Sequence, residues 1–110
     1  MGYRVAVASS DGKFVNDHFG RAAKFLIFEV EEDFFKFVDA RDNIPPCSGW
    51  AHDDGLLAKS IDLIADCQGV LVSQIGPGAS AALQARGVKP FVVPDFIDNA
   101  LKWLMSAEKI

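Results

Sequence analysis

A histidine, a glycine and an arginine stand close together in the stretch NDHFGRAA, residues 16–23. The neutral imidazole of His18 is a good donor to a metal. Gly20 would let a bulky ligand approach the backbone, and Arg21 offers a permanent positive charge with a planar set of donors. With the amide of Asn16 nearby, the combination suits a large anionic ligand better than a bare cation. A single loop histidine can equally be structural, so both interpretations stay open at this point.

A second stretch, PPCSGWAH, residues 45–52, offers a thiol and an imidazole. Cys47 and His52 have a C-x4-H spacing, and together with His18 they could form a soft metal site. Three ligands are too few for a closed structural zinc site, which needs four. Cys47 could instead be a partly buried thiol, and His52 a capping or solvent-facing histidine. Cys67 precedes an apolar run and is expected to be a small core residue.

A third stretch, IGPGAS, residues 75–80, separates an expected strand from an expected helix. Free amides and the dipole at a helix N-terminus favour anions, so Gly76 and Gly78 are candidate contacts for a phosphate or a sulfur-rich cluster. The stretch matches neither a Walker A loop nor G-x-G-x-x-G, which leaves little support for a nucleotide. Close packing of the turn would explain the two glycines equally well.

The elements that position these stretches are expected to form a single α/β domain over residues 1–110. β-branched and aromatic residues predict strands in the first half, the second and third of them an antiparallel hairpin. Helical spacing then alternates with short apolar runs, which predicts parallel βαβα units and a mixed sheet of about five strands. The expected strands cover residues 3–8, 24–30, 34–42, 69–73 and 89–94, and the expected helices cover residues 53–67, 78–87 and 96–105.

Individual residues mark the ends of the expected elements. Asp53 and Asp54 are possible N-caps of the first helix, and Asp95 can cap the last one. Gly87 stands where a left-handed C-cap is expected. In the last helix the apolar positions from Phe96 to Met105 are expected to form one stripe. The two long stretches without regular structure are the one that holds His18 and residues 42–55, and long loops are where function tends to lie.

Composition narrows the class of protein. Half of the residues are hydrophobic, and nine Phe and two Trp are enough for a real core. Eleven Lys and Arg face fifteen Asp and Glu, a net charge of −4, and the basic residues are scattered, so nucleic-acid binding gains no support. No apolar run is long enough to span a bilayer, and the first residues do not read as a signal peptide. We therefore expect a cytoplasmic protein with no membrane contact, in which the two cysteines are not disulfide-bonded.

Two long stretches resemble one known family. VAVASSDGKFVNDHFGRAAKFLIFEV, residues 5–30, and DCQGVLVSQIGPGASAALQARGVKPFVV, residues 66–93, are similar to its two landmarks. This is the dinitrogenase iron-molybdenum cofactor biosynthesis family, which includes NifX, NafY, the C-terminal part of NifB and orange-protein-like members. The HFG element that begins at His18 is the most specific part of the resemblance.

The resemblance implies an RNase H-like fold and a small carrier without turnover. The cargo would be an iron–molybdenum–sulfur cluster or its precursor, or else a molybdenum–copper–sulfur cluster, and the partner a cofactor-assembly or acceptor protein. By motif position His18 would be the ligand to the cluster. Cys47 matches a cysteine often found in the middle loop of the family, although PPCSGW departs from the glycine-richer version of that loop.

Two other classes of function stay open. A metal-dependent hydrolase of a phosphorylated or nucleotide substrate could use an RNase H-like scaffold, with Asp11 or Asp17 as the acidic residues. The sequence contains no motif for nucleophilic catalysis, and we do not expect the protein to be an enzyme. A protein-interaction domain that binds no metal is the third hypothesis.

Overall fold

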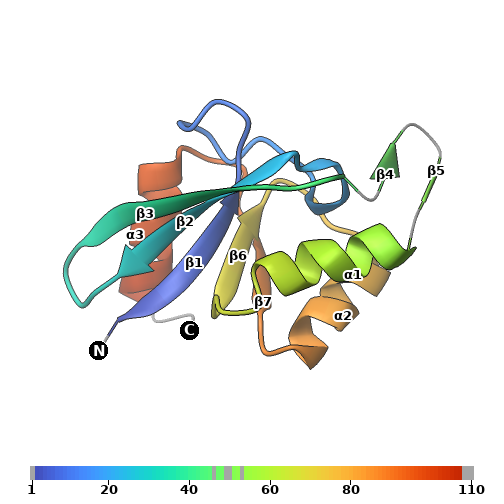
Figure 1. Cartoon of the computed structure of the whole chain (residues 1–110). Helices are drawn as coiled ribbons and strands as arrows, with labels where there is room; N and C mark the ends of the chain where they lie inside the picture. Colours follow the sequence, from blue (N-terminus) through green and yellow to red (C-terminus); the bar gives the residue numbers. More distant parts are fainter. Residues whose placement is uncertain (1, 46, 49–50, 53, 108–110) are drawn as a thin grey trace.

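A five-stranded mixed sheet organises the chain (Figure 1). The computed structural model describes residues 2–45, 47–48, 51–52 and 54–107. The strand order is β3-β2-β1-β6-β7; β1 pairs antiparallel with β2 and β2 with β3, whereas β6 lies parallel to both β1 and β7. The α/β class and the mixed sheet of five strands are as predicted. The strands of the sheet are β1 (Tyr3–Ala8), β2 (Lys24–Val30), β3 (Phe35–Asp42), β6 (Gly69–Val72) and β7 (Lys89–Val92).

Three α-helices cover the two faces of the sheet. Helices α1 and α2 pack on one face and α3 on the other (Figure 1). The strands at the centre of the sheet are therefore buried on both sides, which explains their continuous apolar runs. In β1, Ala6 and Ala8 face α1 and α2, whereas Val5 and Val7 face α3. The helices are α1 (Asp54–Leu63), α2 (Pro77–Ala85) and α3 (Ile97–Ala107), with a short 3-10 helix η1 (Phe19–Arg21).

Several predicted element ends differ from the observed ones by one or two residues, and two predictions of local structure are wrong. The first helix was expected to extend to Cys67 but ends at Leu63, because the next residues close a turn with i→i−3 bonds, such as the one from the Cys67 amide to the Ile64 carbonyl. The stretch of residues 42–55, expected to be irregular, contains two short strands, β4 (Cys47–Ser48) and β5 (Ala51–His52), which form an antiparallel pair.

The predicted signal is confirmed at the end of α2 but not at the start of α3. Gly87 has φ of 80°, and its amide bonds to the Gln84 carbonyl while the Val88 amide bonds to the Leu83 carbonyl, which is a Schellman ending of α2. Asp95 was expected to cap α3, but the helix begins at Ile97. The Asp95 Oδ1 accepts hydrogen bonds from the Phe96 amide at 2.6 Å and from the Asn99 side chain at 3.3 Å, so among the described residues it does not cap an amide of the first helical turn. The N-cap position Asp53 lies outside the described residues.

The last helix buries most of its predicted stripe. Its fully or nearly fully buried residues are Ile97, Ala100, Leu101 and Leu104. Phe96 does not belong to the buried stripe, because it precedes the helix and 58% of its surface is exposed. Among the described residues, none of the helices is long and apolar enough to cross a membrane.

Candidate functional site at the carboxyl ends of β1 and β6

Two neighbouring parallel strands send the chain in opposite directions. After β1 the chain turns to β2 on one side, and after β6 it passes through α2 to β7 on the other side. In open α/β sheets, a crevice opens where adjacent strands diverge in this way, outside their carboxyl ends, and ligands bind there. Residues 9–23 follow β1 and residues 73–76 follow β6, so both predicted stretches lie at this end of the sheet (Figure 1).

Backbone hydrogen bonds fix the His18 segment between the two strands. The amide of Asp17 bonds to the last carbonyl of β1 at 3.2 Å, and the carbonyl of Asp17 accepts from the Ser73 amide at 3.0 Å. The Phe19 amide bonds to the Gln74 carbonyl at 2.9 Å. His18 is thus held on both sides in extended conformation and forms a parallel bridge with Gln74. The structure therefore places the histidine directly beside the turn that begins α2.

Phe19 anchors this segment in the core, as predicted. Its side chain is fully buried, and its ring centroid lies 5.6 Å from that of Phe25 in β2. The imidazole of His18 is partly exposed and has no hydrogen-bond partner among the described residues. Consequently the side chain is free to bind a ligand while its backbone is held.

Other polar residues of the loop maintain its shape. The amide side chain of Asn16 accepts a hydrogen bond from the Ser10 backbone at 3.0 Å and donates one to the Ser10 hydroxyl at 2.9 Å. Asp11 Oδ1 accepts from the amides of Lys13 and Phe14, and these bonds hold the pKa of the carboxyl below its usual value. Both side chains are therefore engaged within the loop.

The turn before α2 is open. Gly76 is the N-cap of the helix, with φ of −77° and no side-chain cap, and Pro77 follows at the first helical position. A Cβ added to Gly76 or Gly78 would meet no atom of the described chain within 4 Å. Neither close packing nor a left-handed conformation therefore requires these glycines, and the alternative explanation that the sequence left open, close packing of the turn, is wrong. The free amides at the N-terminus of α2 therefore have open space beside them, and such amides favour anions.

Ser73 is a polar residue that sequence reasoning missed. Its hydroxyl oxygen is buried and has no hydrogen-bond partner among the described residues. Such orphaned groups are rare and call for an explanation, such as a ligand or an unseen water. The residue lies between the end of β6 and the His18 segment, and its backbone amide bonds to Asp17. The signal in the sequence was a hydroxyl that ends an apolar run just before a glycine turn.

The middle segment approaches the same end of the molecule. Cα atoms of β4 come within 8 Å of those of η1, which contains Gly20 and Arg21. Cys47 and His52 are register partners across β4 and β5, but their side chains lie outside the described part of the structure. The guanidinium of Arg21 is exposed and makes no ion pair with a described residue. The structure therefore brings the three predicted stretches to one end of the sheet.

The electrostatics of the site are mild. Partial burial raises the pKa of Asp17, and the charge of the adjacent His18 opposes that rise. No three described His, Cys, Asp or Glu side chains gather where they could hold a metal ion. Cys67 is buried in the core as predicted, with 2% of its surface exposed, and desolvation raises the pKa of its thiol to about 12.

Comparison with known proteins identifies the family. The family model for the dinitrogenase iron-molybdenum cofactor matches residues 1–107. The chain belongs to that family. It is 37% identical over 100 residues to the FeMo cofactor biosynthesis protein NifB of Frankia alni, a match that covers 88% of this chain and 20% of that protein. It is 33% identical over 95 residues to NifX of Azotobacter vinelandii, which covers 84% of this chain and 57% of NifX.

The family relatives are longer than this chain, which spans about a fifth of the Frankia NifB and just over half of NifX. Among solved structures, the apo form of the orange protein from Desulfovibrio gigas superposes with a TM-score of 0.66 at 22% identity, over 96% of this chain and 89% of that one. The superposition shows that the two share a fold. The match to the family model and the similarity to NifB and NifX confirm the predicted family.

Proposed function

We propose that this domain binds an iron–molybdenum–sulfur cluster, or a precursor of it, in the crevice beyond β1 and β6, and releases it to another protein without turnover. Family membership and the names of NifB and NifX support a role in the biosynthesis of the iron-molybdenum cofactor. The observation that carries the site is the backbone clamp that holds His18 beside the open Gly76 turn. A donor held beside open space suits a bulky cargo.

Each residue of the site has a distinct role in this proposal. His18 supplies the imidazole ligand, and Arg21 supplies positive charge for an anionic cluster. The first free amides of α2 face the cluster, and Gly76 and Gly78 let it come close to the backbone. Cys47 is a candidate second ligand because β4 lies near η1. One or two protein ligands leave most of the cluster accessible to an acceptor, whereas a closed four-ligand site would hinder transfer.

The proposal extends to the cargo, the partner and the fold type. A molybdenum–copper–sulfur cluster is the alternative cargo, and His52 is a further candidate ligand. The partner would be a cofactor-assembly or acceptor protein. The RNase H-like type of fold stays a prediction, as does a cytoplasmic location.

No observation on the described residues supports the hypothesis of a metal-dependent hydrolase. The carboxylate of Asp11 is engaged by the amides of its own loop, and Asp17 is partly buried. Among the described residues these two are not joined by a third acidic or histidine side chain in a metal-binding group. A magnesium-dependent phosphodiesterase activity that is lost on substitution of Asp11 or Asp17 would favour the hydrolase hypothesis over cluster binding.

The test is anaerobic loading with an isolated iron–molybdenum–sulfur cluster. We expect the wild-type protein to acquire visible absorption and to retain molybdenum, iron and acid-labile sulfur through gel filtration. His18→Ala should lose most of this uptake. Asn99→Ala, an exposed polar substitution on α3, is the matched control and should load like the wild type. Equal uptake by the wild type and His18→Ala would refute the ligand assignment.

A second variant tests the crevice itself. Gly76→Ala should leave stability unchanged, because the φ of −77° suits alanine and the new Cβ meets no neighbour within 4 Å. If the cluster occupies this space, the same substitution should weaken loading. A variant that loads normally would place the cargo elsewhere, even if His18 proves to be a ligand.

A further inference from the structure

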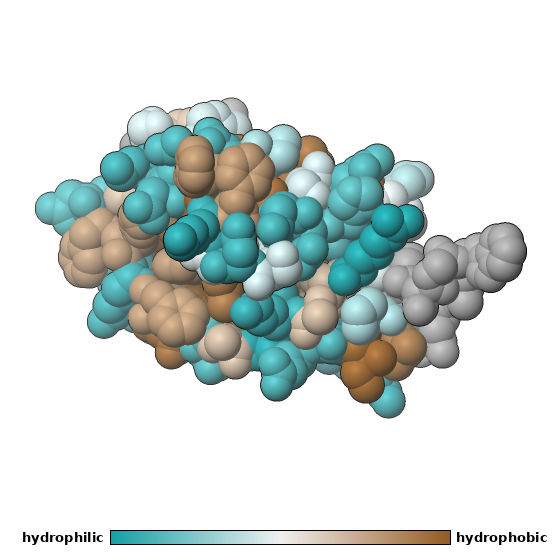
Figure 2. All heavy atoms as spheres, turned by 90° about the horizontal axis from the view of Figure 1, so that it is seen from above, coloured by the Kyte–Doolittle hydropathy of each residue, from teal (hydrophilic) through white to brown (hydrophobic). Residues whose placement is uncertain are grey.

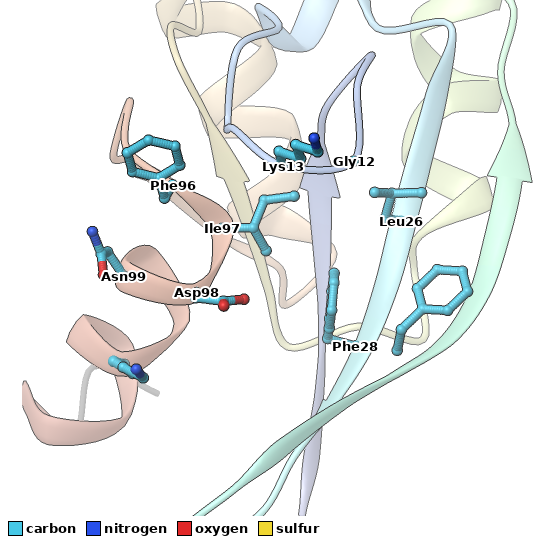
Figure 3. Close-up of a pocket in the computed structure, with 10 residues that line it drawn as sticks. Gly12, Lys13, Leu26, Phe28, Phe96, Ile97, Asp98 and Asn99 are labelled. Carbon is cyan, nitrogen blue, oxygen red and sulfur yellow. The ribbon is translucent and has the colours of Figure 1, made fainter.

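A groove runs between α3 and the strands β2 and β3, on the face opposite α1 and α2 (Figure 3). It has a volume of about 770 Å³. Leu26 and Phe28 line the sheet side, and Ile97 lines the helix side. The turn at Gly12 and Lys13 closes one end. None of the predicted site residues whose side chains the structure describes lines this groove.

The two faces of the sheet are covered unequally. Five strands at a spacing of about 4.8 Å span roughly 19 Å between the outer strand axes. Packed helices lie about 8–10 Å apart, so two helices are needed to cover such a face. Helices α1 and α2 pack against β1, β2 and β6 on one side, whereas α3 alone packs on the other; β3 has no buried residue. On the α3 side Leu26 and Val30 of β2 are buried, whereas Phe37 of β3 is 55% exposed, so the uncovered apolar surface lies toward β3.

The uncovered part is apolar. Phe37 from β3 and Phe96 from the start of α3 both line the groove, and 55% and 58% of their respective surfaces are exposed. Phe28 also lines the groove; its ring centroid lies 5.7 Å from that of Phe37, and its side chain is only partly buried. Figure 2, which looks onto the end of the molecule that carries residues 9–23, shows hydrophobic surface interrupted by hydrophilic side chains. An apolar surface of this kind with a polar border marks an interaction site.

The border of the groove is locally positive. Lys13 lies at one end and Lys102 on the helix side, and neither makes an ion pair with a described residue. Asp98 is the single acidic side chain among the lining residues. Two cations against one anion give the groove a net charge of +1, although the whole chain carries −4. An occupant that completes this surface should therefore bring carboxylates beside its apolar residues.

We propose that the groove binds an amphipathic helix of a partner protein, with its apolar stripe against Phe28, Phe37 and Phe96 and with acidic residues facing Lys13 and Lys102. A helix suits the site better than a strand, because the groove lies over the face of the sheet and not along a free edge. The bound helix would lie beside α3, over the exposed apolar residues of β3. This inference does not rest on the proposed cluster binding.

The probe is a pair of fluorescein-labelled peptides of about 14 residues, long enough for four helical turns. Both carry the same leucine stripe at helical spacing; one has Glu and the other Lys at the positions that flank the stripe. Fluorescence anisotropy at low ionic strength measures their binding to the purified chain. We expect the Glu peptide to bind more tightly, with an affinity that falls as salt is added.

Three variants locate the binding. Phe37→Ser should weaken binding of the Glu peptide about tenfold, as expected for an aromatic anchor at the centre of an interface. Phe34→Ser is the matched control, because Phe34 is 53% exposed but does not line the groove. The double variant Lys13→Glu, Lys102→Glu should reverse the preference, so that the Lys peptide binds more tightly. Circular dichroism checks that each variant is folded. We expect all of them to fold, because the substituted side chains are not buried.

Several outcomes would overturn the proposal. Equal binding of the two peptides by the wild type would refute the claim that Lys13 and Lys102 favour an acidic partner. Equal effects of Phe37→Ser and Phe34→Ser would place the contact outside the groove. A wild-type dimer in analytical ultracentrifugation that Phe37→Ser dissociates would show that a second copy of the chain occupies the groove.

Discussion

Replacement of Phe19 tests the argument that one buried ring positions the functional loop. The side chain is fully buried, and an aromatic residue of this kind removes on the order of 150–200 Å² of apolar surface from water. At about 25 cal/mol per Å² this amounts to roughly 4–5 kcal/mol, and measured Phe→Ala substitutions in cores cost about 3–5 kcal/mol. We therefore expect Phe19→Ala to lower the free energy of unfolding by about 3–4 kcal/mol.

Urea denaturation followed by far-ultraviolet circular dichroism measures this loss. A domain of this size has a total stability of about 5–15 kcal/mol, so the alanine variant could be close to unfolding. Phe19→Leu, which keeps most of the volume, should cost about 1–1.5 kcal/mol and stay folded. Phe96→Ala is the control, because this phenylalanine is 58% exposed, and it should cost clearly less than Phe19→Ala. A loss below about 1 kcal/mol in Phe19→Ala would refute the idea that the ring anchors the loop.

Hydrogen exchange shows whether the loop or the whole domain responds. The amides of Phe19 and Ser73 are bonded across the site and should be protected in the wild type. In Phe19→Leu these amides should exchange faster, while those at the centre of β1 keep their protection. Unchanged exchange at both amides would mean that the backbone clamp holds His18 without help from the ring.

Three further predictions concern stability and reactivity. Hydrogen bonds from Arg41 lower the pKa of Asp66 in the folded protein. The carboxylate therefore stabilises the fold above its unfolded pKa of about 3.9, and this stabilisation is lost as the pH falls through the lower folded pKa. Between about pH 4 and pH 2 the urea midpoint of Asp66→Asn should accordingly drop less than that of the wild type. In a Cys47→Ala variant the remaining thiol is Cys67, and burial raises the pKa of this thiol to about 12. It should therefore resist a disulfide reagent at mildly alkaline pH until urea unfolds the chain. Rapid reaction in the native state would contradict this prediction. Gly87→Ala should cost about 1 kcal/mol in thermal or urea unfolding, because φ is 80° there, and an unchanged midpoint would count against the left-handed helix ending.

Sequence alone determined the regular elements and the family. Alternating and continuous apolar runs placed β1 and β2 at their observed residues, since burial of one or both faces of a strand leaves a local pattern. Gly87 marked the end of α2 because a left-handed conformation strongly favours glycine. The HFG stretch and the second long match were enough to name the family that the comparison confirms.

Only the tertiary structure decided which distant residues meet. The clamp around His18 includes two backbone bonds to residues 73 and 74, more than fifty positions away along the chain, and backbone bonds leave no mark in side-chain chemistry. The freedom of Gly76 from packing became visible only when the neighbours of its missing Cβ were known. The groove beside α3 likewise depends on the number of helices that cover each face. Local patterns record whether a residue is buried, whereas sites and grooves depend on where separate elements diverge, and that is a property of the assembled sheet.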